Sequence, residues 1–200
     1  MVITKFPESK HFNFVVFFVE RIAYPELRPQ YEEMLQMFFD SIQHCMKERA
    51  HFVLITDPRS NIVLPGPKER WIRMLIDVDA DFVTFERVRA YGAYCRSSFF
   101  NLDSYLIDPD VIITREPTIV WQREDFDVGI VCEPKVKQFV CGGMILAPLR
   151  AKEKTAQFFD LALLAERKFD SRMSRAAFTY DQALYAAAFS WQVPPISTVT

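Results

Sequence analysis

The sequence predicts an α/β domain with a mixed, mostly parallel central sheet flanked by helices. Apolar runs of strand length alternate along the chain with segments of helical periodicity, which is the order that builds such a sheet. The first run is apolar without interruption, as in a strand that is buried on both faces. Half of the 200 residues are hydrophobic, which suffices for one sizeable core but not for two. We therefore expect residues 1–200 to form a single domain.

The opening third of the chain predicts a β-α-β unit. Residues 14–19 form the uninterrupted apolar run, and Pro25 and Pro29 mark the loop that follows. Apolar side chains then recur at helical spacing over residues 31–49, and a second strand is expected over residues 51–57. Units of this kind form parallel sheets, whose ligands bind at the carboxyl ends of the strands.

The remainder continues the alternation after an irregular, proline-rich connection over residues 58–70. The elements expected there are a helix over 84–96, a strand over 103–113, two apolar segments at 126–131 and 139–146, and helices over 152–168 and 179–189. The last residues, from Pro194 to Thr200, resemble a strand that is just beginning, which is compatible with a domain trimmed from a longer protein.

The composition argues against several classes of function. A formal net charge of -2 gives no bulk attraction to nucleic acid or to an anionic membrane, so we expect no nucleic-acid partner. The longest N-terminal apolar run, residues 14–19, is too short for a signal sequence or a membrane span. The four cysteines lack metal-binding or redox spacing, which is typical of a reducing compartment. We therefore expect a cytoplasmic protein.

The most informative segment is residues 104–113, in which Asp108 and Asp110 flank Pro109 between two apolar runs. Two carboxylates at a strand end supply the hard oxygen ligands that Mg²⁺ or Mn²⁺ prefers, and such an ion takes its other ligands from a diphosphate. Pro109 cannot donate a backbone hydrogen bond and favours an extended conformation at Asp108. The segment predicts a metal site, and the alternative is a polar strand end whose carboxylates cap nearby backbone groups.

A second acidic cluster competes with this pair. Asp77, Asp79 and Asp81 also follow an apolar run, residues 74–76. They lead into the helix expected from Thr84, however, and acids are favoured electrostatically at the start of a helix. This cluster is the rival candidate for the metal site.

Residues 106–117, Leu-Ile-Asp-Pro-Asp-Val-Ile-Ile-Thr-Arg-Glu-Pro, resemble the hydrophobic-Asp-x-Asp-hydrophobic segment of nucleotide-sugar glycosyltransferases of the GT-A fold. The proline that commonly follows nine positions after the first acid is present as Pro117. The order of elements over residues 12–192 is similar as well: a β-α-β unit, an arginine-bearing helix, the acidic strand, a glycine-bearing strand and a later Asp-Gln. The resemblance implies a single GT-A-like, Rossmann-like domain.

The same resemblance implies an activity. The enzymes of this family transfer a sugar from a nucleoside-diphosphate sugar, most often a UDP-sugar, to a glycan or other acceptor. By this analogy Asp108 and Asp110 would hold Mn²⁺ or Mg²⁺, which bridges the diphosphate and neutralises the charge that develops on the leaving nucleotide. The analogy also assigns Arg87 or Arg89 to the donor sugar or phosphate, because a guanidinium can bind an anion through two nitrogens. The alternative for these arginines is a solvated helix face that they share with Glu86.

Four further positions take roles by the same analogy, each with a structural alternative. The backbone at Gly142 and Gly143 would approach the sugar or phosphate, although a β-bulge explains a glycine pair equally well. Asp181 and Gln182 would line the reaction centre. Alternatively, Gln182 completes a capping box with Thr179, and Asp181 only favours the helix dipole.

The exits of the first two strands supply the last candidates. Arg21 and Tyr24 would contact the base, and Asp57 would contact the base or the ribose, as expected at the carboxyl edge of a parallel sheet. Each of them can also be an ordinary loop residue. One feature departs from the family pattern, in which a histidine after the Asp-Gln helix often completes the metal site. The histidines here are His11, His44 and His51, so water and phosphates, or a residue beyond Thr200, would complete the shell.

Three other functions remain open at this point. An aspartate-nucleophile phosphohydrolase also carries a strand that ends in Asp-x-Asp, but it normally begins with that strand, whereas a β-α-β unit comes first here. A nucleotidyltransferase is expected to have an N-terminal glycine-rich phosphate loop, and the first glycine of this chain is Gly66. The third alternative is an inactive nucleotide-sugar-binding domain.

Overall fold

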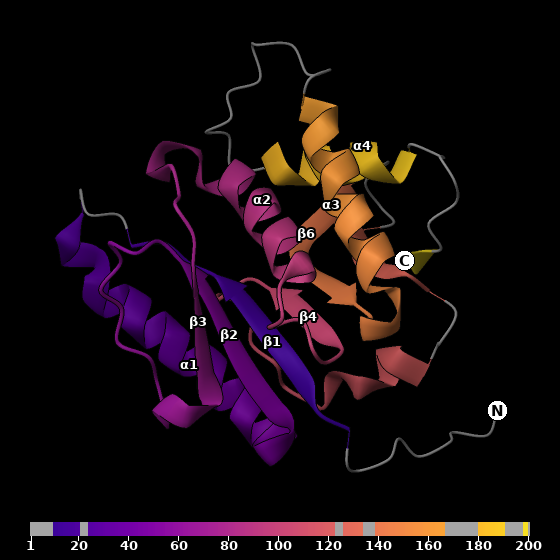
Figure 1. Ribbon diagram of the computed structural model, residues 1–200. Helices are drawn as coiled ribbons and strands as arrows, with labels where there is room; N and C mark the ends of the chain where they lie inside the picture. The colour runs from indigo at the N-terminus through magenta and orange to yellow at the C-terminus, as the bar shows by residue number, and fades with distance from the viewer. Residues whose placement is uncertain are drawn as a thin grey trace.

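The centre of the fold is a seven-stranded sheet with the strand order β3-β2-β1-β4-β6-β5-β7 (Figure 1). The computed structural model describes residues 10–20, 24–122, 126–133, 139–166, 180–190 and 198–199. The strands are β1 (Phe12–Phe17), β2 (Ala50–Thr56), β3 (Trp71–Leu75), β4 (Ser104–Ile107), β5 (Val128–Glu133), β6 (Phe139–Ala147) and β7 (Thr198–Val199). Strand β6 is antiparallel to β4 and β5, and the other pairs in the described part are parallel. The predicted α/β class with a mixed, mostly parallel sheet is confirmed.

The opening β-α-β unit is also confirmed. Strands β1 and β2 pair in parallel from Phe12 opposite Ala50 to Phe17 opposite Ile55. Helix α1 (Arg28–Met46) connects them. Pro29 lies in its first turn, where the N–H that proline lacks would have no intrahelical partner. All six side chains of β1 are buried, as the uninterrupted apolar run predicts.

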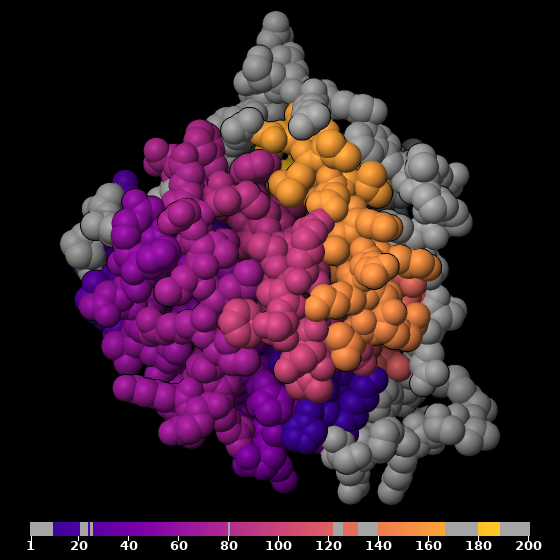
Figure 2. Space-filling model, in the orientation of Figure 1, coloured from indigo at the N-terminus to yellow at the C-terminus, as the bar shows by residue number. Residues whose placement is uncertain are grey.

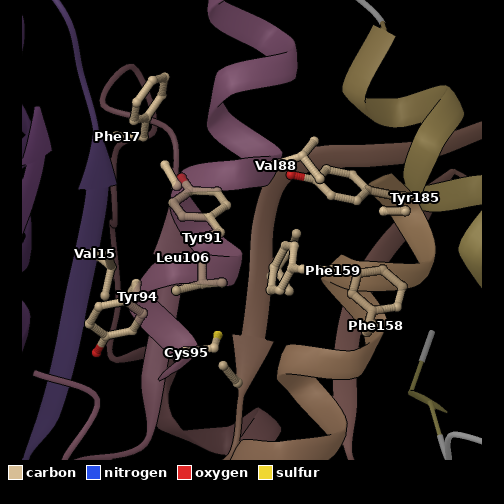
Figure 3. Packing of buried hydrophobic residues seen from close by; sticks show 14 of the residues in the cluster. Val15, Phe17, Val88, Tyr91, Tyr94, Cys95, Leu106, Phe158, Phe159 and Tyr185 are labelled. Atoms are coloured by element: carbon tan, nitrogen blue, oxygen red, sulfur yellow. The ribbon is translucent and has the colours of Figure 1, made fainter. Parts of the chain in front are cut away.

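Helices cover both faces of the sheet. Successive side chains of a strand point to opposite faces: Phe14 and Val16 pack in the core under α1, whereas Val15 and Phe17 pack in a second core. That second core lies beneath α2 (Val83–Arg96), α3 (Lys152–Ala165) and α4 (Tyr180–Ser190). Figure 3 shows Tyr91 of α2, Phe158 and Phe159 of α3, and Tyr185 of α4 in this core. On the outer surface, the side chains of α2 and α3 meet (Figure 2).

Two parts of the sheet differ from the prediction. Strand β3 follows the irregular connection and was not expected as a strand, because it lies at the sheet edge and leaves Arg73 and Leu75 exposed. The strand expected over 103–113 ends at Ile107. The chain then turns, since the N–H of Val111 donates to the carbonyl of Asp108 at 3.2 Å. The prediction that residues 108–113 continue the strand is therefore wrong, and the two acids lie in the turn after β4.

Within the described residues, no helix has both the length and the apolar character that a membrane crossing requires.

The contact between the imidazoles of His11 and His51 leads to a prediction about the stability of the fold in acid. They lie at the start of β1 and β2, with His11 Nδ1 3.0 Å from His51 Nε2. Burial lowers the pKa of His51, and the nearby His11 and Arg70 lower it further. The folded protein therefore binds fewer protons here than the unfolded chain, whose histidine has a pKa of about 6.5. The stability that the neutral form of His51 allows is fully present above about pH 6.5. It is lost as the pH falls from there through the lower pKa of the folded state.

We expect His51→Gln to lose less stability than the wild type between pH 7 and pH 5, as measured by urea unfolding at each pH. The exposed His44 on α1 provides a matched control, and His44→Gln should behave as the wild type. An equal loss of stability in His51→Gln and in the wild type would show that His51 does not destabilise the fold in acid.

Candidate functional site

Arg87 of α2 lies between two carboxylates that come from distant parts of the chain. Its Nη1 donates to Oδ1 of Asp108, and its Nη2 donates to Oδ2 of Asp181. Both contacts are ion pairs, formed with partners 21 and 94 positions away. The structure thus brings together three of the residues that the sequence predicts for a site. We call Arg87, Asp108 and Asp181 the Arg87 cluster.

Three elements position the cluster. Arg87 lies one turn into α2, and Asp108 follows directly after β4. The N–H of Asp108 donates to the carbonyl of Gly143 on β6 at 3.0 Å, which holds the turn against the neighbouring strand. Asp181 is the second residue of α4, a helix that packs on β6, α2 and α3 (Figure 1). The cluster therefore joins the end of a parallel strand to two helices of one face.

The glycine pair in β6 leaves space for the side chains of the cluster. The register between β5 and β6 shifts from Ile130 opposite Ile145 to Val131 opposite Cys141, so residues 142–144 have no partner on β5. The pairing of the two strands is therefore irregular at the glycine pair. A β-carbon at Gly142 would lie 2.8 Å from Asp181 Oδ2 and 3.4 Å from Arg87 Nη2. The groups that approach the backbone at Gly142 are therefore the side chains of Asp181 and Arg87.

The charges of the cluster do not cancel. One guanidinium faces two carboxylates, and the exposed Asp110 lies in the same turn as Asp108. Burial raises the pKa of Asp108 above its ordinary value, Arg87 opposes this, and Asp110 and Asp181 add to it. Burial also disfavours the charged form of Arg87, but Asp181 and Asp108 outweigh it and raise the pKa of the guanidinium. An excess of negative charge at a partly exposed position favours a cation.

Several polar atoms at this place are buried and have no hydrogen-bond partner among the residues that the structure describes. They are Nε of Arg87, Oδ1 of Asp181 and the hydroxyl of Tyr185, and Oε1 of Gln182, the next residue along the chain, is unpaired as well. Buried polar groups in proteins are nearly always paired. Unpaired donors and acceptors gathered around one ion-pair cluster therefore indicate a place where a polar ligand or ordered water completes the hydrogen bonding.

Tyr185 is the site residue that the sequence reasoning missed. It is fully buried, and its Cε2 would lie 3.3 Å from a β-carbon at Gly142. Burial raises the pKa of its hydroxyl well above the ordinary value, and the negative charge of Asp181 raises it further. A signal was available, because Tyr185 follows Asp181 by four positions, the spacing that places two side chains on one face of a helix.

The residues fit a divalent ion in part. Arg87 engages Oδ1 of Asp108, so Oδ2 of this carboxylate and the exposed carboxylate of Asp110 are the donors that the protein would offer. No group of three or more histidine, cysteine, aspartate or glutamate side chains is gathered for a metal in the described ranges. Mg²⁺ and Mn²⁺ accept a site of two carboxylates when water and phosphate oxygens fill the other positions. The fit is therefore to an ion that takes its other ligands from water or from phosphate oxygens.

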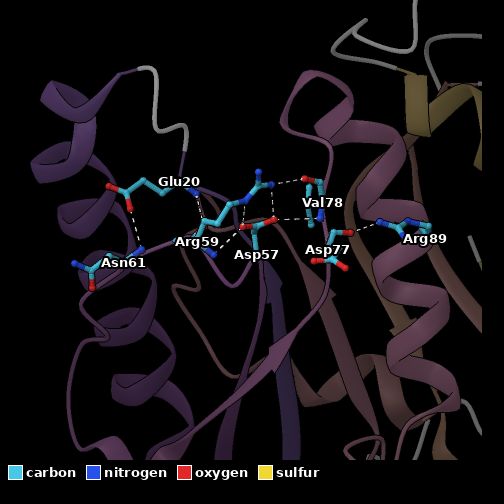
Figure 4. A network of polar contacts seen from close by, with 8 residues as sticks. Glu20, Asp57, Arg59, Asn61, Asp77, Val78 and Arg89 are labelled. Atoms are coloured by element: carbon cyan, nitrogen blue, oxygen red, sulfur yellow. Dashed lines mark hydrogen bonds and ion pairs between the residues drawn. The ribbon is translucent and has the colours of Figure 1, made fainter.

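Two other predicted residues lie in a separate polar network (Figure 4). Asp57 at the end of β2 is buried and accepts hydrogen bonds from the side chain and N–H of Arg59 and from the N–H of Val78. The bonds from Arg59 hold the pKa of Asp57 well below its ordinary value. Arg89 donates to Glu86 and to the carbonyl of Asp77. Both residues are thus engaged by other parts of the chain and not by the Arg87 cluster.

Nothing in the described part of the chain places the remaining candidates in the Arg87 cluster. The side chain of Tyr24 is exposed after β1, and Arg21 and Thr179 lie outside the described residues. In the rival acidic segment, Oδ1 of Asp79 accepts a hydrogen bond from the N–H of Asp81 at 3.0 Å and so begins a short 3₁₀ helix. This is the role expected of an acid at a helix start.

The glycine pair provides a prediction about packing. Gly142→Ala should destabilise the fold by about 1–3 kcal/mol, because its β-carbon must displace the Arg87–Asp181 ion pair. Gly143→Ala is the matched control, since its β-carbon would lie at ordinary contact distances, 3.4 Å from Cys141 Sγ and 3.5 Å from Asp108 Oδ2. Urea unfolding of the two variants measures the difference. Equal stability of both variants would show that the cluster does not require the glycine.

Known proteins give no independent assignment of this site. No protein-family model matches the chain, and no curated protein matches it either. The functional argument therefore depends on the geometry of the Arg87 cluster and on the sequence pattern around Asp108.

Proposed function

We propose that the chain is a metal-dependent glycosyltransferase that transfers a sugar from a nucleoside-diphosphate sugar to a glycan or other acceptor. The observation that carries this proposal is the meeting of Arg87, Asp108 and Asp181 at the carboxyl end of β4. The resemblance gives these residues related roles, at the donor phosphate or sugar, at the metal and at the reaction centre. UDP is the expected nucleotide because it is the commonest one in the family.

Each part of the site has a task in this proposal. Asp108 and Asp110 would hold Mn²⁺ or Mg²⁺, which when bound neutralises the charge on the departing nucleoside diphosphate. The unpaired Oε1 of Gln182 would accept a hydrogen bond from a sugar hydroxyl, and Asp181, whose side chain is fully buried, would orient the reaction centre through Arg87. The ion pair with Arg87 would hold Asp181 in place, because a buried carboxylate without a partner is costly.

The order of elements supports a phosphohydrolase less well. Such an enzyme normally begins with the acidic strand, whereas β4 follows a β-α-β unit, and only Oδ2 of Asp108 would be left to attack phosphorus because Oδ1 accepts from Arg87. A binding domain without activity would use the same metal and nucleotide contacts. Release of free sugar or its transfer, measured with nucleotide sugars in the presence of Mn²⁺, separates an enzyme from a binding domain.

Nucleotide binding is the first test of the proposal. Calorimetric titration with UDP, GDP, CDP and dTDP should show binding of at least one of them, UDP being expected, and the binding should require Mn²⁺. Thermal unfolding gives a second readout, because a ligand that binds only the folded state raises the melting temperature. Absence of binding by all four nucleotides would reject the glycosyltransferase.

The acidic pair should be essential for this binding. Asp110→Asn is the cleaner variant, because Asp110 is exposed and its replacement does not break the Arg87 cluster. Asp110→Asn and Asp108→Asn should each abolish Mn²⁺-dependent UDP binding in calorimetry, since each removes a charged metal ligand. Asp77→Asn and Asp79→Asn serve as controls and should bind as the wild type. Undiminished binding in both variants of the pair would place the metal elsewhere.

Asp181 should matter for turnover more than for nucleotide binding. If it positions the donor sugar, Asp181→Asn should lower turnover of a nucleotide sugar by about 100-fold or more, with UDP affinity at saturating Mn²⁺ nearly unchanged. Steady-state kinetics and UDP titration of the same preparation measure the two effects. Turnover within a few-fold of the wild type would leave Asp181 a purely structural partner of Arg87.

A further inference from the structure

The two carboxylates of the Arg87 cluster differ in what can reach them. The side chain of Asp108 is 22 % exposed, whereas that of Asp181 is 0 % exposed and that of Arg87 is 14 % exposed. A cation that arrives from solvent can therefore bind Asp108 but cannot bind Asp181. Asp108 can therefore interact with the guanidinium of Arg87 and also with a metal ion from solvent.

Arg87 and Asp181 are also incompletely bonded to each other. They share one contact, from Nη2 to Oδ2, while Nε of Arg87 and Oδ1 of Asp181 are both buried and unpaired. A guanidinium and a carboxylate can form two parallel hydrogen bonds, one from Nε and one from an Nη nitrogen. The two unpaired atoms are the donor and the acceptor that such a bidentate pair requires.

We propose that Arg87 has two bonded arrangements, and that a divalent ion on Asp108 shifts it from bridging both carboxylates to a bidentate pair with Asp181. This inference rests on the proposed function, in which Asp108 is a metal ligand. Two cations on one carboxylate repel each other, and the repulsion is less screened at a partly buried position than in water. Arg87 yields Asp108 but stays in the cluster, because leaving it would bury an unpaired Asp181.

The proposal makes Arg87 a positioning residue and Asp181 the group that sets metal affinity. Metal binding would complete the hydrogen bonding of Asp181 and so fix the carboxylate at the reaction centre. By linkage, whatever strengthens the Arg87–Asp181 pair must also strengthen metal binding. The metal would therefore prepare the reaction centre through a residue that it does not touch.

The test measures Mn²⁺ binding alone, without nucleotide, from the electron paramagnetic resonance signal of free Mn²⁺. In Asp181→Asn the second charged partner of Arg87 is gone, so Arg87 should hold Asp108 more firmly and Mn²⁺ affinity should fall by about tenfold or more. Adding Arg87→Met to this variant removes the competing cation and should restore affinity at least to the wild-type level. The double variant has the same net charge in the cluster as the wild type.

A matched control separates competition from a simple loss of negative charge. Glu86 neighbours Arg87 in sequence, but its carboxylate is paired with Arg89. Glu86→Gln removes one negative charge from the same helix and should leave Mn²⁺ affinity within about twofold of the wild type. An equal loss in Glu86→Gln and Asp181→Asn, or no recovery in the double variant, would overturn the proposal.

The change in bonding has its own signature. In a ¹⁵N spectrum, the Nε–H of Arg87, assigned by its disappearance in Arg87→Lys, should shift and exchange more slowly with solvent when diamagnetic Mg²⁺ is added, because it gains Oδ1 of Asp181. An unchanged signal with Mg²⁺ bound would reject the two arrangements and leave the glycosyltransferase standing. If neither Mn²⁺ nor Mg²⁺ binds the wild type, the metal site and this inference both fail.

Discussion

The partly buried ion pairs of Arg87 are the interaction on which the site depends. They connect α2, the end of β4 and the start of α4, three elements that lie far apart in the sequence. Such pairs contribute little net stability, because desolvation offsets most of the attraction, yet the loss of one partner is expensive. Their effect is to determine which side chains face one another. The fold therefore brings together three charges that the chain keeps far apart.

A geometric constraint accompanies this electrostatic one. Residues 142–144 of β6 have no partner on β5, and the missing side chain of Gly142 leaves the space that Asp181 and Arg87 occupy. Substrate contact is not needed to explain this glycine, because the side chains of the protein itself make the close approach. Gly142 thus allows Arg87 and Asp181 to pair. A ligand would contact the charged cluster and not the glycine.

The sequence predicted the fold class well, because buried parallel strands and amphipathic helices leave clear periodic patterns, as in β1 and α1. It missed β3, where an edge position mixes Arg73 and Leu75 with buried residues. The periodicity of hydrophobic residues could not predict that Arg87 pairs with Asp181, since 94 positions separate them. The family resemblance pointed to both residues, but only the folded structure shows that they are in contact. The engagement of Asp57 by Arg59 is local and lies within the range of turn rules.

The antiparallel direction of β6 has a consequence for how this protein could change. Loops usually line a site at the edge of a parallel sheet and can be exchanged freely. Here part of the lining is a strand that β4 and β5 hold on both sides, and its backbone bonds directly to Asp108. This part of the site tolerates little variation. A shift in ligand preference would have to arise outside this strand, while the charged centre stays the same.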